Sequence, residues 1–150
     1  MKKLLSIILL SVVLIGCSEE RVLNDELTNK GTQVNPTMYF EGALFNGVSF
    51  NVYSNGQLKS EVNWKDGEKD GLWKQWHSNG QLRFEVNLKD GKEDGLGKQW
   101  YENGQLKIEV NLKDGKKDGL YKEWHANGQL ESEFNYWDGL AYGLGKIWYG

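Results

Sequence analysis

One segment decides the fold of this chain: Gly119-Leu-Tyr-Lys-Glu-Trp-His-Ala-Asn-Gly-Gln-Leu130. Its last four residues, Asn-Gly-Gln-Leu, occur four times at intervals of 24 residues, beginning at Asn55, Asn79, Asn103 and Asn127. A fixed period of this length indicates one supersecondary unit copied in tandem. The sequence therefore predicts a repeat protein.

Four more residue types recur in the same register within each copy. They are the glycines Gly71, Gly95, Gly119 and Gly143, the leucines Leu72, Leu96, Leu120 and Leu144, the lysines Lys74, Lys98, Lys122 and Lys146, and the tryptophans Trp76, Trp100, Trp124 and Trp148. These last four are called the repeat tryptophans below. Because charged and aromatic groups recur with the period, the pattern favours a repeated surface over a single active site.

The stretch after each Asn-Gly dipeptide has the pattern of a strand. Leu82, Phe84, Val86 and Leu88 alternate with polar residues, and a period of two is typical of a half-buried strand. Asp-Gly follows these strands, at Asp66-Gly67, Asp90-Gly91, Asp114-Gly115 and Asp138-Gly139. Both dipeptides favour the positive φ angles of hairpin turns. The predicted fold class is all-β, an elongated single antiparallel meander sheet of tandem 24-residue β-hairpins.

The register of each Asn-Gly hairpin has two solutions. With a two-residue turn, the residues that join the apolar face are Trp73, Gln75 and His77. With a three-residue loop in which Gly80 forms a G1 bulge, pairing shifts by one residue and those that join it are Leu72, Lys74 and Trp76. We favour the second solution because it gathers the repeated leucines and tryptophans with the other apolar side chains.

The first residues of the chain have the pattern of a signal peptide. A basic start, Met1-Lys2-Lys3, precedes an apolar run from Leu4 to Ile15, whose twelve residues would form a helix of about 18 Å, too short to span a bilayer. The segment Leu14-Ile15-Gly16-Cys17 resembles the bacterial lipobox. The resemblance implies cleavage after residue 16 and lipidation of Cys17, the only cysteine. We therefore expect a lipid-anchored protein of the bacterial cell envelope, in the outer membrane if the cell is Gram-negative.

The rest of the chain divides into a linker and a repeat domain. Residues 17–37 are polar and contain no aromatic residue, which favours a flexible tether. Residues 38–150 form the repeat domain, with a degenerate first unit, units from 55, 79, 103 and 127, and an additional strand expected within 38–45. Loss of residues 1–16 would remove two lysines and no acidic residue, leaving 16 basic and 21 acidic residues, a net charge of −5. This balance argues against nucleic-acid binding.

The repeat also resembles a known family. The glycine, the aromatic residues that follow it and Asn-Gly-x-Leu are similar to the MORN-repeat variant of bacterial proteins, in particular the YwqK-type antitoxin-like family, over roughly residues 40 to 150. Gly97 and Gly145 depart from the pattern, because they stand where Trp73 and Tyr121 supply an aromatic ring. The resemblance implies protein binding.

The residue types do not suggest an enzyme or a cofactor. His77 and His125 share their repeat position with Tyr53, Tyr101 and Tyr149, so we interpret them as aromatic residues that fill a structural position. Glutamates recur opposite the lysines, which cross-strand charge pairing explains; they are Glu61, Glu85, Glu109 and Glu133. Two carboxylate groups could in principle hold Ca²⁺, namely Asp66, Glu68 and Asp70, or Asp90, Glu93 and Asp94. Lysines in the same turns make paired, solvated charges the better interpretation, so we expect no metal.

The aromatic content is the strongest hint of a binding surface. Seven tryptophans and seven tyrosines are many for one sheet, and exposed apolar patches often mark partner sites. The repeat tryptophans form either a buried stripe or a binding face. The leading hypothesis is a non-enzymatic, lipid-anchored scaffold for protein–protein interaction at the cell envelope. The alternative is a cell-wall or polysaccharide-binding module, with a glycan as the ligand.

Overall fold

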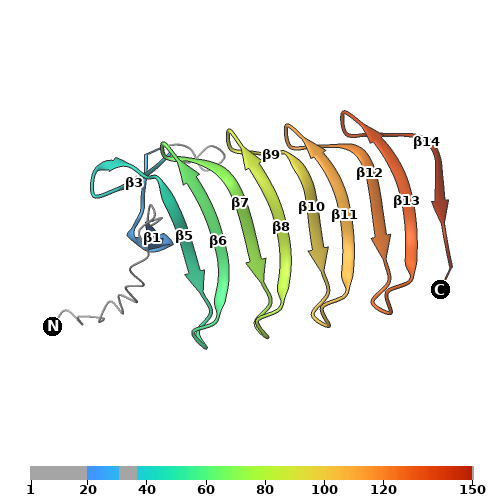
Figure 1. Ribbon diagram of the computed structural model, residues 1–150, viewed down its shortest axis with the longest axis horizontal. Coiled ribbons are helices and arrows are strands. Elements are labelled where there is room, and N and C mark those ends of the chain that lie inside the picture. The colour runs from blue at the N-terminus through green and yellow to red at the C-terminus, as the bar shows by residue number, and fades with distance from the viewer. Residues whose placement is uncertain (1–19, 31–36, 150) are drawn as a thin grey trace, which may run out of the picture.

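The repeat forms one long antiparallel sheet, which confirms the predicted fold class. In the computed structural model, which describes residues 20–30 and 37–149, eleven strands make up the sheet and follow one another almost in chain order (Figure 1). Its strands are β1 (Arg21–Leu23), β5 (Gly47–Val52), β6 (Leu58–Lys65), β7 (Glu68–Trp76), β8 (Leu82–Lys89), β9 (Lys92–Glu93), β10 (Gly95–Trp100), β11 (Leu106–Lys113), β12 (Lys116–Trp124), β13 (Leu130–Trp137) and β14 (Leu140–Ile147). The Asn-Gly turns lie along one long edge and the Asp-Gly turns along the other (Figure 1).

The Asn-Gly turns are three-residue loops, as the favoured register predicted. The N–H of His77 donates to the carbonyl of Gln81 at 2.8 Å, and the N–H of Gly80 donates to the carbonyl of His77 at 2.9 Å. Gly80 has a φ of 86°, the left-handed conformation that the last residue of such a loop requires. The same pair of bonds closes the loops Tyr53–Gln57, Tyr101–Gln105 and His125–Gln129.

A second bulge, further into each hairpin, overturns the side-chain arrangement predicted from that loop. Gln75 pairs with Phe84, so Arg83 is an extra residue of β8. The three-residue loop shifts the pairing by one residue, and the bulge at Arg83 shifts it by one more. The side chains beyond the bulge therefore face the same sides of the sheet as they would after a two-residue turn. The prediction that Leu72 and Lys74 share the apolar face is therefore wrong, because both side chains lie on the opposite face of the sheet.

The alternation gives the sheet two unlike faces. The aromatic face carries large apolar side chains, namely Trp73, Phe84, Val86, Leu88, Ile108, Val110, Leu112, Tyr121, Phe134 and Tyr136. The ladder face carries a row of charged side chains, namely Glu61, Lys74, Glu85, Lys98, Glu109, Lys122, Glu133 and Lys146. Each member of this row lies directly opposite the next on the neighbouring strand.

The Asp-Gly turns are two-residue hairpins. In the first of them Lys65 pairs with Glu68, and Asp66 and Gly67 have φ angles of 49° and 78°. Positive φ at both central residues is the type I′ geometry that matches the twist of the flanking strands. In all four turns the N–H of the glycine also donates to the carbonyl of the residue 22 positions earlier, for example Gly91 to Lys69 at 2.9 Å, and this bond connects neighbouring units.

The N-terminal end of the sheet holds most of the core. Val22, Phe45 and Trp64 form a buried cluster, and β1 pairs in parallel with β5. A separate small sheet consists of β2 (Thr28–Asn29), β3 (Met38–Phe40) and β4 (Ala43–Leu44), and a 3₁₀ helix, η1, spans Asn24–Glu26. The flexible tether predicted for residues 17–37 is therefore corrected for residues 20–30, because apolar Val22 is buried against the sheet and pins the segment down.

The repeat part of the sheet is a single layer. Among the described residues from Gly71 onward, Val86 and Leu88 are the only buried hydrophobic side chains. The other apolar side chains of the aromatic face are half-buried. No helix within residues 20–30 and 37–149 is long and apolar enough to cross a membrane.

Candidate functional site

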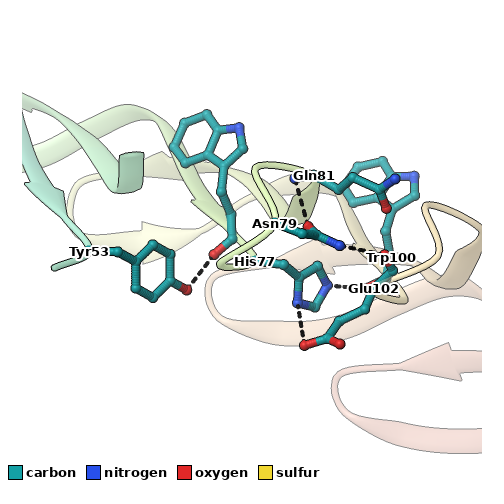
Figure 2. Close-up of polar contacts among 7 residues, drawn as sticks. Tyr53, His77, Asn79, Gln81, Trp100 and Glu102 are labelled. Atoms are coloured by element: carbon teal, nitrogen blue, oxygen red, sulfur yellow. Dashed lines mark hydrogen bonds and ion pairs between the residues drawn. The ribbon is translucent and has the colours of Figure 1, made fainter. Parts of the chain in front are cut away.

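The Asn-Gly edge of the sheet is held by a row of hydrogen bonds between neighbouring units. The hydroxyl of Tyr53 donates to the carbonyl of Trp76 at 2.7 Å, and that of Tyr101 donates to the carbonyl of Trp124 at 2.9 Å. Between them, Nε2 of His77 lies 3.0 Å from the carbonyl of Trp100 (Figure 2). Because a carbonyl only accepts, Nε2 of His77 must carry the hydrogen. His77 thus fills the same structural position as Tyr53 and Tyr101, as predicted, whereas Nε2 of His125 is buried without a hydrogen-bond partner among the described residues.

The asparagines of the Asn-Gly turns form a second row. The side-chain oxygen of Asn79 accepts a bond from the N–H of Gln81 at 3.0 Å, and its amide donates to the carbonyl of Glu102 at 2.8 Å (Figure 2). The first bond holds the turn in shape, and the second connects it to the next turn. Asn55 and Asn103 make the corresponding bonds. These two rows explain why the Asn-Gly dipeptide and the aromatic residue before it recur.

The charge row of the ladder face confirms the predicted cross-strand pairing. Ion pairs join Lys74 to Glu85 at 3.2 Å, Lys98 to Glu109 at 3.4 Å, and Lys122 to Glu133 at 3.5 Å. At the N-terminal end Arg21 pairs with Glu61. The paired groups from Lys74 to Glu133 are about a third exposed, so each pair contributes only about 0.2–1 kcal/mol. The ladder therefore sets register and does not resemble a catalytic site.

The predicted binding stripe lies at the Asn-Gly edge. Three of the repeat tryptophans pair with the first residue of the following strand, Leu82, Leu106 or Leu130. These three are half-buried, whereas Trp148 is 40% exposed. The stripe is therefore neither a buried core nor a bare face, and its role in binding stays a prediction.

The other predicted sites are distributed as follows. Cys17, the predicted lipidation site, lies outside the described residues. The carboxylates of the two turns considered for Ca²⁺ lie in separate Asp-Gly turns, and no three His, Cys, Asp or Glu side chains within residues 20–30 and 37–149 converge as metal ligands would. Lys116 instead pairs with Asp138 of the next turn at 2.6 Å.

A hollow on the aromatic face is the site that sequence reasoning missed. It has a volume of about 550 Å³ and extends along β9 and β10. Its lining combines aromatic, amide and charged groups from Trp73, Gln75, His77, Arg83, Phe84, Glu93, Gln99, Trp100, Tyr101, Glu102 and Lys107. Trp73 and Phe84 pack edge to face with ring centroids 5.0 Å apart. The signal in the sequence was Glu93, which stands where the neighbouring units have Lys69 and Lys117.

The units on either side of this hollow carry a lysine–aromatic pair that this unit lacks. The ammonium of Lys69 lies 5.3 Å from the centroid of the Trp73 ring, and that of Lys117 lies 4.0 Å from the centroid of the Tyr121 ring. These are cation–π distances. The corresponding positions of the intervening unit are Glu93 and Gly97. Both members of the pair have changed together, and the cation has become an anion.

Tyr121 shows how tightly such a pair is packed. Burial raises the pKa of its hydroxyl, and the hydrogen bond that it donates to Glu123 at 2.8 Å raises it further. Its ring meets that of Tyr136 edge to face at 5.9 Å. Aromatic rings therefore fill this part of the face at Tyr121, whereas aliphatic side chains cover Gly97.

A single-layer sheet of tandem hairpins, with one face interrupted by a hollow, defines a repeat scaffold with an extended surface. The profile of the family described as MORN repeat variant matches residues 45–66, 69–90, 93–114 and 117–138, which is more than half of the chain. The chain belongs to the MORN repeat variant family. Repeats of this kind are modules for interaction with proteins or membranes. The first match, 45–66, covers the unit that the sequence identified as degenerate.

Other comparisons add little. No curated protein matches the chain in sequence. Among solved structures, it is similar to one chain of the crystal structure of accessory secretory protein 1, 2 and 3 in Streptococcus pneumoniae, with 12% identity and a TM-score of 0.23. That match covers 75% of this chain but only 17% of the other. This likeness is too slight to support an argument about function.

Proposed function

We propose that this protein is a non-enzymatic scaffold that binds another protein at the bacterial cell envelope, to which lipid on Cys17 anchors it. The observation that carries the proposal is the single layer of the repeat sheet. Among the described residues from Gly71 onward, its aromatic face has only two buried hydrophobic side chains, Val86 and Leu88. An extended, half-exposed apolar face in a repeat protein is typical of a partner-binding surface.

The repetition of polar groups supports a binding role over a catalytic one. Each lysine and glutamate of the ladder face is engaged by its cross-strand neighbours, and His77 is engaged by the carbonyl of Trp100. These groups hold the sheet together and have no partner arrangement of the nucleophile–base kind. The anchoring part of the proposal rests on the lipobox resemblance of residues 14–17 alone.

Crosslinking in intact cells, followed by purification of the protein, tests the binding role. We expect one envelope protein to be recovered reproducibly in addition to the lipoprotein-processing machinery. Recovery of that machinery alone would contradict the proposal. Cell fractionation tests the anchor, because Cys17→Ser is expected to move the protein from the membrane fraction to the soluble fraction. A variant that stays with the membrane would contradict lipid anchoring.

A further inference from the structure

We propose that the hollow along β9 and β10 binds an extended peptide segment of the partner, with a lysine or arginine side chain at Glu93 and an acidic side chain at Arg83. The inference rests on the proposed protein-binding function and names the site and the chemistry of its ligand. A functional site in a tandem repeat is expected where the pattern is broken. Glu93 and Gly97 both break it in the same unit, and Glu93 lines the hollow.

The neighbouring units show which group the hollow lacks. In one of them the ammonium of Lys69 lies against Trp73, and in the other that of Lys117 lies 4.0 Å and 4.7 Å from the ring centroids of Tyr121 and Tyr136. At the hollow this lysine is replaced by Glu93, while the aromatic rings of Trp73 and Phe84 still line one side. A carboxylate beside aromatic rings favours a cation from outside the chain.

The two ends of the hollow carry opposite charges without ion-pair partners. Among the described residues, neither Glu93 nor Arg83 takes part in any ion pair (the pairs of the sheet are those of the ladder face and the turns). Lys107 also lines the hollow and lies 5.4 Å from the centroid of the Tyr101 ring. Glu102 lines it as well, with its carboxylate 3.9 Å from Nδ1 of His77. The two cations Arg83 and Lys107 outnumber this one carboxylate, so the hollow has an acidic end at Glu93 and a basic end at Arg83. A neutral glycan would cover both charges without neutralising either, which favours a peptide.

The length of the hollow fits an extended peptide. Six residues separate Glu93 from Gln99, which pairs with Phe84 beside Arg83, and this corresponds to roughly 20 Å along the strand. An extended peptide places residues i, i+2 and i+4 on one side, over roughly 13 Å. Long basic and acidic side chains at its ends would span the remainder, and an apolar side chain at i+2 would meet Trp73 and Phe84.

The test uses the full chain and blocked pentapeptides as probes, read through the indole N–H signal of Trp73 in a nitrogen-edited NMR spectrum. The probes are Lys-Ser-Leu-Ser-Glu and its reverse order, with norleucine-Ser-Leu-Ser-Gln as the neutral control. We expect a saturable shift of the Trp73 signal with one charged peptide and at least tenfold weaker binding of the neutral one. Glu93→Gln is expected to weaken binding at least tenfold. Glu68→Gln, which removes the same charge at an exposed turn, is expected to leave binding unchanged.

A second variant reverses the charge at the acidic end of the hollow. Glu93→Lys introduces the lysine found at Lys69 and Lys117, and we expect it to abolish binding of the charged peptide without lowering the unfolding midpoint, because Glu93 takes part in no ion pair among the described residues. Equal binding of the neutral peptide, equal binding by Glu93→Gln, or a Trp73 shift with chitotetraose and not with the peptides would overturn the inference. If the peptides fail while crosslinks to a partner persist, this site is refuted and the scaffold proposal stands. If the peptides bind and no partner is recovered from cells, the scaffold proposal is refuted instead.

Discussion

The ring of Phe134 lies over Gly145, in the space that a side chain at position 145 would occupy. Val86 has the corresponding place against Gly97, two units earlier, and its smaller side chain leaves 3.5 Å between its Cγ2 and the position of a Cβ on Gly97. The space at Gly97 is also closed by two more side chains, because a Cβ there would lie 3.0 Å from Cδ1 of Leu112 and 3.4 Å from Cγ1 of Val110. One phenylalanine ring therefore fills the place of the missing aromatic residue at Gly145, and three aliphatic side chains fill it at Gly97.

Gly145→Ala is expected to destabilise the protein by about 1–3 kcal/mol, because the added methyl group overlaps the Phe134 ring and forces it to move. Phe134→Val with Gly145→Ala is expected to recover part of that loss, giving a coupling energy of about 0.5–3 kcal/mol. Urea unfolding of both single variants and the double variant measures it. Additive effects would show that the two residues are not in contact.

Tyr101→Phe is expected to lower the free energy of unfolding by about 0.5–1.5 kcal/mol, because the carbonyl of Trp124 loses its hydrogen-bond donor. Tyr149→Phe is the matched control, since Tyr149 has the same repeat position but is 95% exposed. Its expected effect is within about 0.5 kcal/mol. Thermal unfolding of the two variants compares them, and equal effects would contradict a structural role for this row of bonds.

Lys122→Glu is expected to destabilise the sheet by about 1 kcal/mol at low salt, because Lys122 lies opposite two glutamates, Glu109 and Glu133. Lys146→Glu should cost about half as much, since Lys146 lies opposite Glu133 alone. Both losses of stability should be smaller in 1 M salt, where the Debye screening length falls to about 3 Å. Unfolding measured at low and high salt checks this, and a salt-independent loss would point to packing instead of charge.

Tyr121 predicts a loss of stability at alkaline pH. Its pKa is raised in the folded state from the ordinary value of 10.0, so below pH 10 both states keep the proton and this group adds no pH dependence. Above pH 10 the unfolded state ionises first, and the free energy of unfolding falls. Tyr121→Phe is expected to reduce this slope between about pH 10 and 11, as denaturant unfolding at several pH values would show. An unchanged slope would contradict the burial and hydrogen bond assigned to the hydroxyl.

Asp114 has a φ of 50°, which a β-branched side chain tolerates poorly. Asp114→Val is therefore expected to destabilise the hairpin by about 1–2 kcal/mol, whereas Asp114→Gly is expected to be neutral or slightly stabilising at that turn. Denaturant midpoints of the two variants measure the difference. Equal tolerance of valine and glycine would show that the turn is not type I′.

Most of the fold could be predicted because the same local sequence pattern occurs in every repeat unit. The period, the Asn-Gly loops, the Asp-Gly turns and the facing lysines and glutamates are all local patterns, and the structure confirms each of them. The face of Leu72 could not be predicted, because the bulge at Arg83 leaves no mark in side-chain composition. The contact of Val22 with Phe45 depends on the parallel pairing of β1 with β5, which are distant in sequence. The polar composition of the segment around Val22 does not predict this pairing.

The candidate site was only half visible in the sequence. Gly97 was recognised as a departure from the pattern, but its consequence depends on Leu112, Val110 and Val86, which are its neighbours only in the folded sheet. The paired change at Glu93 could be found by aligning the units, yet the meaning of that change needs the lysine–aromatic contact of Lys117 and Tyr121. The repeat tryptophans attracted attention because of their size, whereas their place at the turn edge gives them a structural contact first.

Photo-crosslinking from two adjacent residues of β10 tests the central claim most directly. Gln99 lines the hollow on the aromatic face, and Lys98 lies on the ladder face opposite Glu85 and Glu109. A benzophenone amino acid placed at either position samples one face of the same strand in living cells. We predict a discrete crosslinked protein from position 99 that is lost with Glu93→Gln, and none from position 98. The same product from both positions, or a product from position 98 alone, would contradict a partner bound in the hollow.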